Sequence, residues 1–291
     1  MVKNSTVGDQ AAYLKPKDYA KERRCRLQIW QFSLPHCELP IELYISINFQ
    51  TTAMALQPWR TGKIIRIENE TYNTRRYWFE VSELESFDFE PGQFVTLDLP
   101  IHEKPAKRWR SYSIASWPDG TNVFELVIVL LEGGAGTTWL FNNAVVGTEI
   151  PVRGPQGVFT LDEENYQKDL FLVCTGTGIA PFRSMAHHIA RNNIPHKDIY
   201  IIFGCRTKND LLYYDELRAL QLDNFHYIPT LSREEWEGKK GYVHSIYEEH
   251  CCGKQAASFF LCGWKNMIDE AKQRIQAMGY DRKSIHQELY G

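Results

Sequence analysis

Residues 170–183 have the sequence LFLVCTGTGIAPFR, and this stretch sets the organisation of the C-terminal part of the chain. Its apolar beginning, residues 170–174, predicts a buried strand. Gly176 and Gly178 follow at once, and Pro181 suits the first turn of a helix because proline lacks the N–H that would be unpaired there. The N-terminus of such a helix attracts anions. The pattern indicates a phosphate-binding turn. A tight turn without a ligand stays open, since Pro181 replaces the last glycine of the G-x-G-x-x-G motif.

Downstream of about residue 168, short apolar runs alternate with segments of helical character. This alternation predicts a parallel sheet that is covered by helices on both faces and connected by right-handed crossovers. Ligands bind such sheets outside the carboxyl ends of the strands, and residues 175–181, 232–233 and 262–263 are expected there. The expected strands are residues 170–174, 199–204, 225–231, 258–262 and 284–289, and the expected helices are residues 179–191, 214–220, 242–249 and 265–278.

Between residues 59 and 165 the pattern is all-β. Short strands separated by turn sequences such as Glu90-Pro91-Gly92 predict a small antiparallel six-stranded barrel. The predicted fold class is therefore two-domain β + α/β, with the barrel in residues 54–165 and the parallel-sheet α/β domain in residues 166–291. The expected barrel strands are residues 62–68, 76–81, 93–99, 111–115, 123–131 and 149–152, with one short helix near residues 137–143.

Residues 1–53 differ from the rest of the chain. Basic side chains crowd residues 15–26, and two prolines follow. Three interpretations stay open: a disordered extension, a targeting peptide, or sequence upstream of the true start at Met54. Acidic residues within the segment disfavour a transit peptide, which is usually poor in acids.

The bulk properties exclude several classes of protein. A net charge of −3 argues against a dedicated nucleic-acid-binding protein. The chain has neither a long apolar run nor a secretory signal pattern, so no membrane span is expected. The seven cysteines lack the spacing of zinc or plant-type iron–sulfur sites, and they indicate reduced thiols in a cytoplasmic protein without a metal site.

Three motifs occur in a fixed order: Arg110-Ser111-Tyr112-Ser113 in the barrel, residues 176–181 in the sheet domain, and Cys262-Gly263 near the end. Together they resemble the ferredoxin–NADP⁺ reductase family of flavoproteins, over about residues 59–291. The resemblance implies an FAD-binding barrel followed by an NAD(P)-binding domain. It also implies that hydride passes between nicotinamide and flavin in the cleft between the two domains.

The resemblance implies that two barrel segments bind the flavin. A guanidinium such as that of Arg110 suits a diphosphate, and the flat ring of Tyr112 suits stacking on the isoalloxazine. A surface arginine and an inward barrel aromatic are the plain alternatives. Residues 133–138 resemble the second flavin motif of the family, Gly-Gly-x-x-Ser, with a threonine in place of serine. The expected flavin-binding residues are Arg110, Ser111, Tyr112, Ser113, Gly134, Gly136, Thr137 and Thr138.

The nucleotide is expected at the strand ends of the α/β domain. Ser232 and Arg233 stand where NADPH-dependent members place a hydroxyl and an arginine for the 2′-phosphate, whereas NADH users commonly have an acidic residue there. Lys240 and Tyr242 resemble a further pair at the phosphate and the adenine. A solvated charged loop is the alternative. The expected nucleotide-binding residues are Thr175, Gly176, Thr177, Gly178, Ser232, Arg233, Lys240, Tyr242, Cys262 and Gly263.

The resemblance also implies a hydride-transfer site. Residues 262–267 are similar to the family's Cys-Gly-x-x-x-Met segment. Near its end the chain resembles the family's Glu-x-Tyr terminus, whose tyrosine covers the second face of the flavin until nicotinamide displaces it, and here Gly291 follows that tyrosine. A buried thiol and a frayed aromatic are the alternatives. The expected catalytic residues are Ser113, Cys262, Glu288 and Tyr290, and Tyr290 is also expected to bind the flavin.

The sequence thus predicts a cytoplasmic reductase with FAD and NADP as cofactors. Hydride moves between NADPH and FAD, and single electrons move between FAD and an acidic carrier protein such as ferredoxin or flavodoxin. Lys104, Lys107 and Arg108 suit a basic docking surface, or a merely solubilising loop. Two other functions remain possible: the reductase component of an oxygenase or another electron-transfer chain, and a non-catalytic flavin-binding regulatory subunit. The set of expected catalytic residues disfavours the regulatory subunit.

Overall fold

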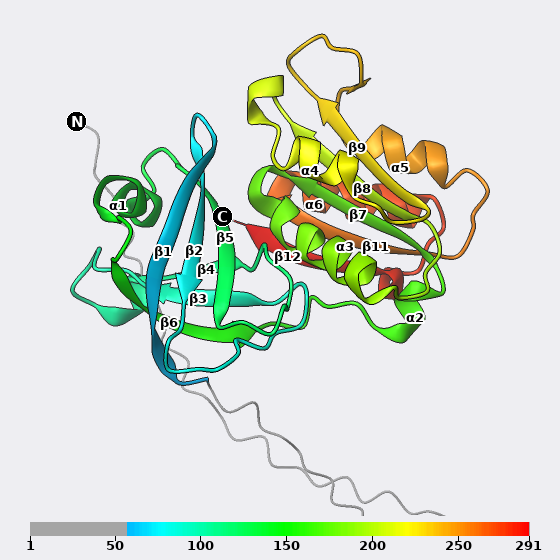
Figure 1. Cartoon of the computed structure of the whole chain (residues 1–291). Helices are drawn as coiled ribbons and strands as arrows, with labels where there is room; N and C mark the ends of the chain where they lie inside the picture. The colour runs from blue at the N-terminus through cyan, green and yellow to red at the C-terminus, as the bar shows by residue number, and fades with distance from the viewer. Residues whose placement is uncertain (1–56, 291) are drawn as a thin grey trace, which may run out of the picture. The chain divides into compact units, whose positions relative to one another are not determined.

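The computed structural model of the protein describes residues 57–290, which contain two six-stranded sheets (Figure 1). The first sheet is antiparallel and the second is parallel, so the predicted fold class is confirmed. The expected extension, residues 1–53, lies outside the described residues. Within the described range, no helix is long and apolar enough to cross a membrane.

The barrel sheet has the strand order β4-β3-β6-β1-β2-β5. A single bridge between Ile114 and Leu126 joins the two outer strands and closes the barrel. Side chains that alternate along the strands, such as Val95 and Leu97, fill its interior. The strands are β1 (Trp59–Thr71), β2 (Thr74–Glu80), β3 (Phe94–Asp98), β4 (Trp109–Ser113), β5 (Val123–Val129) and β6 (Glu149–Gln156), and the helix α1 spans Ala135–Asn143.

Two barrel strands are longer than the sequence predicts. Strand β1 begins at Trp59, which pairs with Arg153 of β6. Strand β6 continues to Gln156, which pairs with Phe94, through a Gly-Pro pair that is typical of turns. Pairing with a neighbouring strand extends both elements, and in β6 it overrides the local turn chemistry.

The parallel sheet has the strand order β10-β9-β8-β7-β11-β12. Helices α3 and α4 pack on one face, and α5 and α6 on the other (Figure 1). The strands are β7 (Asp169–Thr175), β8 (Ile199–Cys205), β9 (Phe225–Leu231), β10 (Lys239–Lys240), β11 (Ala257–Trp264) and β12 (Ile285–Tyr290). The helices are α2 (Glu163–Tyr166), α3 (Ala180–Asn192), α4 (Tyr214–Ala219), α5 (His244–His250) and α6 (Lys265–Ala277).

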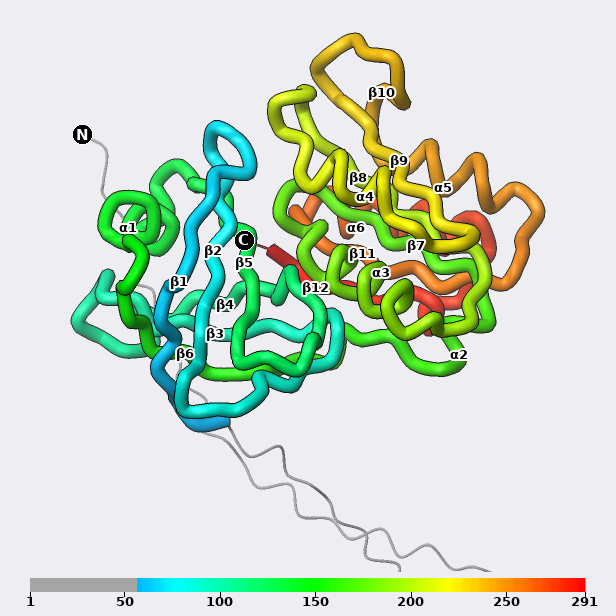
Figure 2. The backbone as a smooth tube through the Cα atoms, viewed as in Figure 1, coloured from blue at the N-terminus to red at the C-terminus, as the bar shows by residue number. Residues whose placement is uncertain are grey.

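Two elements of this domain carry no hydrophobic pattern, and the sequence does not predict them. These are β10, which is two exposed lysines, and the single-turn helix α2, through which the chain passes from β6 to β7 (Figure 2). Tertiary pairing and an Asp162 cap, which accepts a hydrogen bond from the Asn165 backbone N–H, create them.

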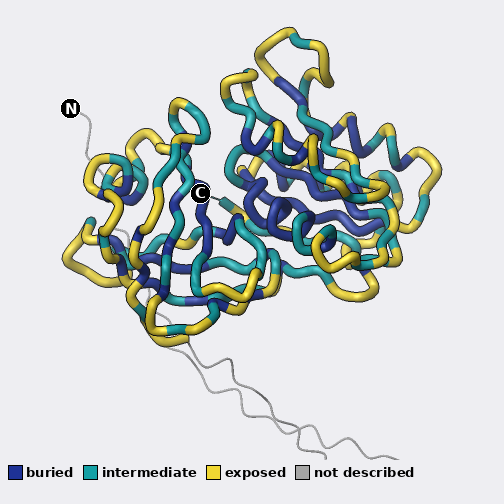
Figure 3. The backbone as a smooth tube through the Cα atoms, viewed as in Figure 1, coloured by how far each residue is buried: buried dark blue, intermediate teal, exposed yellow. Residues whose placement is uncertain are grey.

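The most continuously buried strands lie in the middle of the parallel sheet (Figure 3). Strands β7, β8 and β11 are buried along almost their whole length, because helices cover both faces. One apolar cluster reaches beyond the sheet: Ala115 and Val127 of the barrel pack with Ile179 and Phe182 of the α/β domain. The two sheets therefore share part of their hydrophobic core.

Candidate active site

A cleft of about 1510 Å³ is lined by residues of both sheets. The barrel contributes β4, the end of β5 and the start of α1. The parallel sheet contributes the segments that follow β7, β8, β9 and β11, as well as the end of β12. These are the carboxyl ends at which ligands of open α/β sheets bind. Single ligand pockets commonly measure about 300–1,000 Å³, so this cleft is large enough for extended cofactors.

Strand β4 places four consecutive predicted residues at the cleft, Arg110 to Ser113. The guanidinium of Arg110 donates to the carbonyl oxygens of Lys107 (3.0 Å) and Trp109 (2.7 Å). Its stem lies against the first turn of α1, where a Cβ on Gly136 would approach Arg110 Cγ to 3.0 Å. The guanidinium and the helix N-terminus thus lie together, an arrangement that suits a diphosphate.

The turn before α1 is fixed by the hydroxyl of Thr137. This oxygen accepts from the N–H of Leu131 (3.1 Å) and lies 3.1 Å from the carbonyl oxygen of Gly134. Gly134, Gly136 and Thr137 line the cleft. Thr138 is exposed and is not among the described residues that line it. The hydroxyl at position 137 therefore shapes the turn and also faces the cleft.

The glycine turn after β7 is a 3₁₀ turn, Gly176–Ile179, that precedes α3. Gly176 has φ 55 and open space beside it, and it lines the cleft with Thr175 and Thr177. Gly178 has a different role, since a Cβ there would lie 2.4 Å from the carbonyl oxygen of Cys262. The structure thus gives Gly176 a place at the cleft and Gly178 a packing role between the turn and β11.

The end of β11 approaches the same turn closely. Gly263 has φ 140, and a Cβ there would lie 2.4 Å from Thr175 Oγ1, so a side chain is excluded at this position. Gly263 lines the cleft, whereas the side chain of Cys262 is fully buried. Burial raises the pKa of the Cys262 thiol well above its usual value, so the group stays neutral. Cys262 can orient a neighbour but is not a reactive thiolate.

The two domains meet in a contact between the hydroxyl of Ser113 and the carboxyl group of Glu288. Ser113 is 4% exposed, and Glu288 stands beside Cys262 in the register of β12 on β11. Burial raises the pKa of Glu288 above its ordinary 4.5, and the hydrogen bond from Ser113 opposes this shift. A partly buried carboxyl group therefore lies where the end of β4, the strand expected to bind flavin, meets the end of β12 in the parallel sheet.

Tyr290 follows Glu288 on β12 and packs against the shared core. Its hydroxyl is buried and has no hydrogen-bond partner among the described residues. Burial raises the pKa of this phenol, so it stays protonated. A buried polar atom without a partner is uncommon and marks a place where a further group can bind.

Of the four residues predicted to bind the adenosine part of the nucleotide, only two line the cleft. Ser232 and Tyr242 line the cleft. Arg233 and Lys240 are exposed and do not occur among the described residues of the lining, and the Lys240 ammonium group pairs with the Glu235 carboxylate. Arg206 lines the cleft instead.

The position of Arg206 in the sequence could have identified it, although it belongs to none of the family motifs. Arg206 follows β8 directly, at the same sheet edge at which Ser232 follows β9, and the backbone N–H of Ser232 donates to Cys205 (3.0 Å). Position relative to a strand end, rather than a motif, identifies this residue. His244, at the start of α5, is a second cleft residue that no motif indicates.

The residues present fit a bound FAD and a nicotinamide nucleotide. A glycine cradle lies beside Arg110, a partly buried aromatic face is available at Tyr112, and the hydroxyl of Tyr290 is buried without a partner. Two glycine turns leave backbone exposed at the cleft for phosphates. These features suit two extended, negatively charged ligands that carry flat rings.

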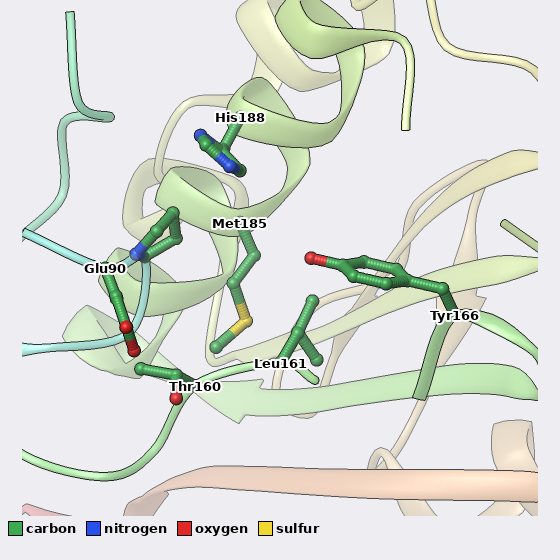
Figure 4. Close-up of a pocket in the computed structure, with 7 residues that line it drawn as sticks. Glu90, Thr160, Leu161, Tyr166, Met185 and His188 are labelled. Carbon is green, nitrogen blue, oxygen red and sulfur yellow. The ribbon is translucent and has the colours of Figure 1, made fainter. Parts of the chain in front are cut away.

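A second, smaller pocket has a volume of about 240 Å³ (Figure 4). Its lining includes Glu90, Tyr166, Met185 and His188, and it contains none of the predicted site residues. A pocket of this size lies below the range of ordinary ligand sites. The large cleft is therefore the candidate active site.

Comparisons with known proteins agree with this site. The family model for the oxidoreductase FAD-binding domain matches residues 61–161, and that for the oxidoreductase NAD-binding domain matches residues 172–273. A ferredoxin–NADP reductase B from Sorangium cellulosum is 37% identical, over 74% of this chain and 91% of that protein. A glycine betaine monooxygenase reductase subunit from Pseudomonas aeruginosa is 32% identical, over 85% of this chain and 69% of that protein.

Solved structures show the same architecture. A cytochrome P450 reductase from Amycolatopsis superposes with a TM-score of 0.71 at 26% identity, over 80% of this chain and 70% of the other. A ferredoxin NADP⁺ reductase from Neisseria gonorrhoeae with bound FAD and NADP superposes with a TM-score of 0.66 at 24% identity. The superposition covers 79% of this chain and 98% of the other. The chain therefore belongs to the ferredoxin–NADP⁺ reductase family of NAD(P)H-dependent FAD oxidoreductases.

Proposed function

We propose that this reductase uses NADPH as its coenzyme and passes electrons to a ferredoxin or flavodoxin. The contact between Ser113 and Glu288 supports hydride exchange between nucleotide and flavin, because it brings the end of β4 and the end of β12 together inside one cleft. The choice of coenzyme and of acceptor rests on the charged groups at the cleft edge and before β4. When bound, FAD accepts hydride and releases electrons singly, while the protein supplies orientation and electrostatics.

Four residues are assigned roles at the junction. The Ser113 hydroxyl lines the cleft and orients the rings that bind there, while the fully buried Cys262 supports Glu288, its partner in the strand register, from outside the lining. The Glu288 carboxylate stabilises positive charge that develops on a nicotinamide as it loses hydride. The ring of Tyr290 covers the second face of the flavin until a nicotinamide ring displaces it. Small displacements matter here, because a shift of ~1 Å can cost ~100-fold in rate.

The preference for NADPH is assigned to the edge where β8 and β9 end. A 2′-phosphate carries close to two negative charges, and a guanidinium can grip it through parallel hydrogen bonds. Arg206 and Ser232 line the cleft at this edge, and Arg233 follows Ser232 directly. One charge-assisted contact is worth about 1.5–3 kcal/mol, which corresponds to a preference of roughly ten- to a hundredfold.

The acceptor is proposed to be an acidic carrier protein. Lys104 and Lys107 are exposed in the turn that leads into the flavin strand β4. Arg108 is held there by the Asp98 carboxylate, with Nε 2.7 Å from Oδ1. Basic groups beside a redox site steer an acidic partner and raise the rate of its association.

A direct test uses the purified flavoprotein without oxygen. NADPH is expected to bleach the flavin, and the reduced protein is expected to reduce ferredoxin or flavodoxin. The second reaction should weaken as salt rises, because the docking charges are exposed. A flavin that NADPH does not bleach would contradict the proposal, and so would bleaching without electron transfer to either carrier.

A second candidate is the reductase component of an oxygenase. The 32% identical relative is a monooxygenase reductase subunit, and one structural neighbour is a cytochrome P450 reductase. Rapid electron transfer to an oxygenase component or a cytochrome, with slow transfer to ferredoxin and flavodoxin, would favour this candidate over the first.

A further inference from the structure

A second set of polar side chains, distinct from the proposed catalytic residues, joins the barrel to the α/β domain. Glu125 of β5 is 2% exposed, and its carboxylate accepts hydrogen bonds from Arg76 (2.6 and 3.0 Å), Arg183 (3.1 Å) and the Tyr213 hydroxyl (2.8 Å). Arg183 of α3 also binds the Glu216 carboxylate through two bonds of 2.6 and 3.0 Å. The inter-sheet network consists of Arg76, Glu125, Arg183, Tyr213 and Glu216.

The guanidinium of Arg183 is bonded to both domains. Its Nη1 donates to the carbonyl oxygen of Ala115 (2.7 Å), two residues after Ser113. Arg183 itself lies five residues after Gly178, on the helix that follows the nucleotide turn. A single buried side chain thus ties the end of the flavin strand to the start of the nucleotide helix.

Tyr213 is held by the barrel at both ends. Its backbone N–H donates to Glu70 Oε1 of β1 (2.6 Å), and its hydroxyl donates to Glu125. Its backbone has φ 51, in the left-handed region that aromatic residues rarely adopt. Such a conformation persists only where the surroundings determine it, and it occurs often where position matters for function.

Buried charges are a poor means of merely holding two domains together. Their desolvation offsets much of their attraction, and apolar side chains of similar volume commonly stabilise as well or better. Hydrogen bonds to two guanidinium groups contribute to the geometry of the domain contact rather than to its stability, because each bond restricts an angle as well as a distance. The network therefore restricts how the barrel can turn relative to the α/β domain.

We propose that the inter-sheet network sets the relative orientation of the two domains in which Ser113 and Glu288 meet. Its members are then positioning residues for hydride transfer and do not touch the reacting atoms. This proposal rests on the proposed function, since it requires that flavin and nicotinamide bind on opposite sides of that contact.

The test compares Tyr213→Phe and Glu125→Gln with the wild-type FAD holoenzyme. Titration with NADP⁺ gives a flavin difference spectrum whose amplitude reports the stacking of the two rings and whose midpoint reports binding. Rapid mixing with NADPH gives the rate of flavin reduction. We expect a smaller amplitude and a saturating rate at least about tenfold lower, with FAD retained and the NADP⁺ midpoint changed less than about twofold.

Tyr280→Phe is the matched control. Its hydroxyl donates to the carbonyl oxygen of Gln255 (3.1 Å) within the α/β domain, and neither residue lines the cleft, so its loss should change neither amplitude nor rate. Glu125→Gln removes the charge between the buried Arg183 guanidinium and the partly buried Arg76 guanidinium, and it lowers stability as well. Tyr213→Phe removes one hydroxyl only, so it tests the positioning role even if Glu125→Gln does not fold.

Two results would overturn the proposal. One is a wild-type amplitude and rate in Tyr213→Phe. The other is a loss of rate that merely follows weaker NADP⁺ binding or loss of FAD. Failure of the proposed function looks different, because it appears in the wild-type protein: a flavin that NADPH does not bleach, or that NADH bleaches equally well.

Discussion

At the scale of single residues, Glu288 combines two properties that oppose each other. Burial raises the pKa of its carboxyl group, while its proposed role requires the ionised form. The hydrogen bond from Ser113 favours ionisation and partly restores it. The folded protein therefore holds the Glu288 carboxylate in a partly unfavourable environment, at the place where its negative charge can stabilise the nicotinamide cation.

The pH dependence of hydride transfer should report this group. We expect the rate of flavin reduction to rise with pH through a pKa above 4.5, because only the carboxylate stabilises the nicotinamide cation. In Glu288→Gln the rate should be lower and flat across the same range. A wild-type profile that is retained in Glu288→Gln would assign the titration to another group.

The same group gives a stability prediction with a defined sign. A pKa raised by folding contributes stability below the unfolded pKa, and this stability is lost as pH rises through the folded pKa. Glu288→Gln should therefore raise the melting temperature at neutral and higher pH. The difference should vanish at acidic pH, where the wild-type carboxyl is neutral in both states. A variant that melts below the wild type at pH 8 would contradict the assigned cost of the buried charge.

Two arginine variants separate the candidates for the 2′-phosphate. We expect Arg206→Ala to lower kcat/KM for NADPH by roughly ten- to a hundredfold and to leave NADH nearly unchanged, because only NADPH offers the phosphate. Arg233→Ala tests the residue that the motif favours, and its expected effect is smaller because the side chain lies outside the cleft lining. A larger loss in Arg233→Ala would restore the motif-based assignment.

The residues of the site differ in how far the sequence could predict them. Arg110 and Gly176 follow from short motifs. The Ser113–Glu288 contact joins residues 175 positions apart, and only a family resemblance could suggest it. The bond between Arg183 and Glu125 follows from no motif or periodicity, because a polar pair becomes buried only when two separately folded faces meet.

At the scale of elements, the proposed flavin site depends on how closely α1 approaches β4. A Cβ on Gly136 would meet Arg110 Cγ at 3.0 Å and Leu99 Cδ1 at 3.2 Å. Neither residue can move far, since Leu99 is fully buried and Arg110 is bonded to two carbonyl oxygens. The small size of residue 136 thus sets the distance between helix and strand.

Gly136→Val should lower the FAD content of the purified protein. The larger side chain fits only if α1 shifts away from β4, which separates the helix N-terminus from the Arg110 guanidinium, and one charge-assisted bond to a diphosphate is worth about 1.5–3 kcal/mol. Ala135→Val, at an exposed position of the same turn, is the matched control and should retain FAD. Full FAD content in Gly136→Val would remove this turn from the flavin site.

The ends of individual strands are the features that local sequence patterns predict least well. The change from short strands separated by turns to alternating strands and helices predicts an antiparallel sheet followed by a parallel one, and the structure contains both in that order. The extension of β6 through Gly154-Pro155 and the short strand β10 depend on a neighbouring strand, which no local window contains.

At the scale of the whole molecule, the central claim is that two separately recognisable domains build one reaction site. The described residues support it in two places: the Ser113–Glu288 contact in the cleft, and the inter-sheet network that fixes the orientation of the domains. Sequence patterns predict each domain but not their mutual orientation, because that orientation is set by side chains that become partners only in the folded chain.

A double-mutant cycle on flavin reduction tests this claim most directly. The saturating rate with NADPH is measured by rapid mixing for the wild type, Ser113→Ala, Glu288→Gln and the double variant, all with FAD bound. If the two residues act as one unit, each single variant slows reduction and the double variant is little slower than the worse single one, with a coupling of about 0.5–3 kcal/mol. Rates that multiply as for independent sites, or wild-type rates in all variants, would contradict a reaction site shared between the domains.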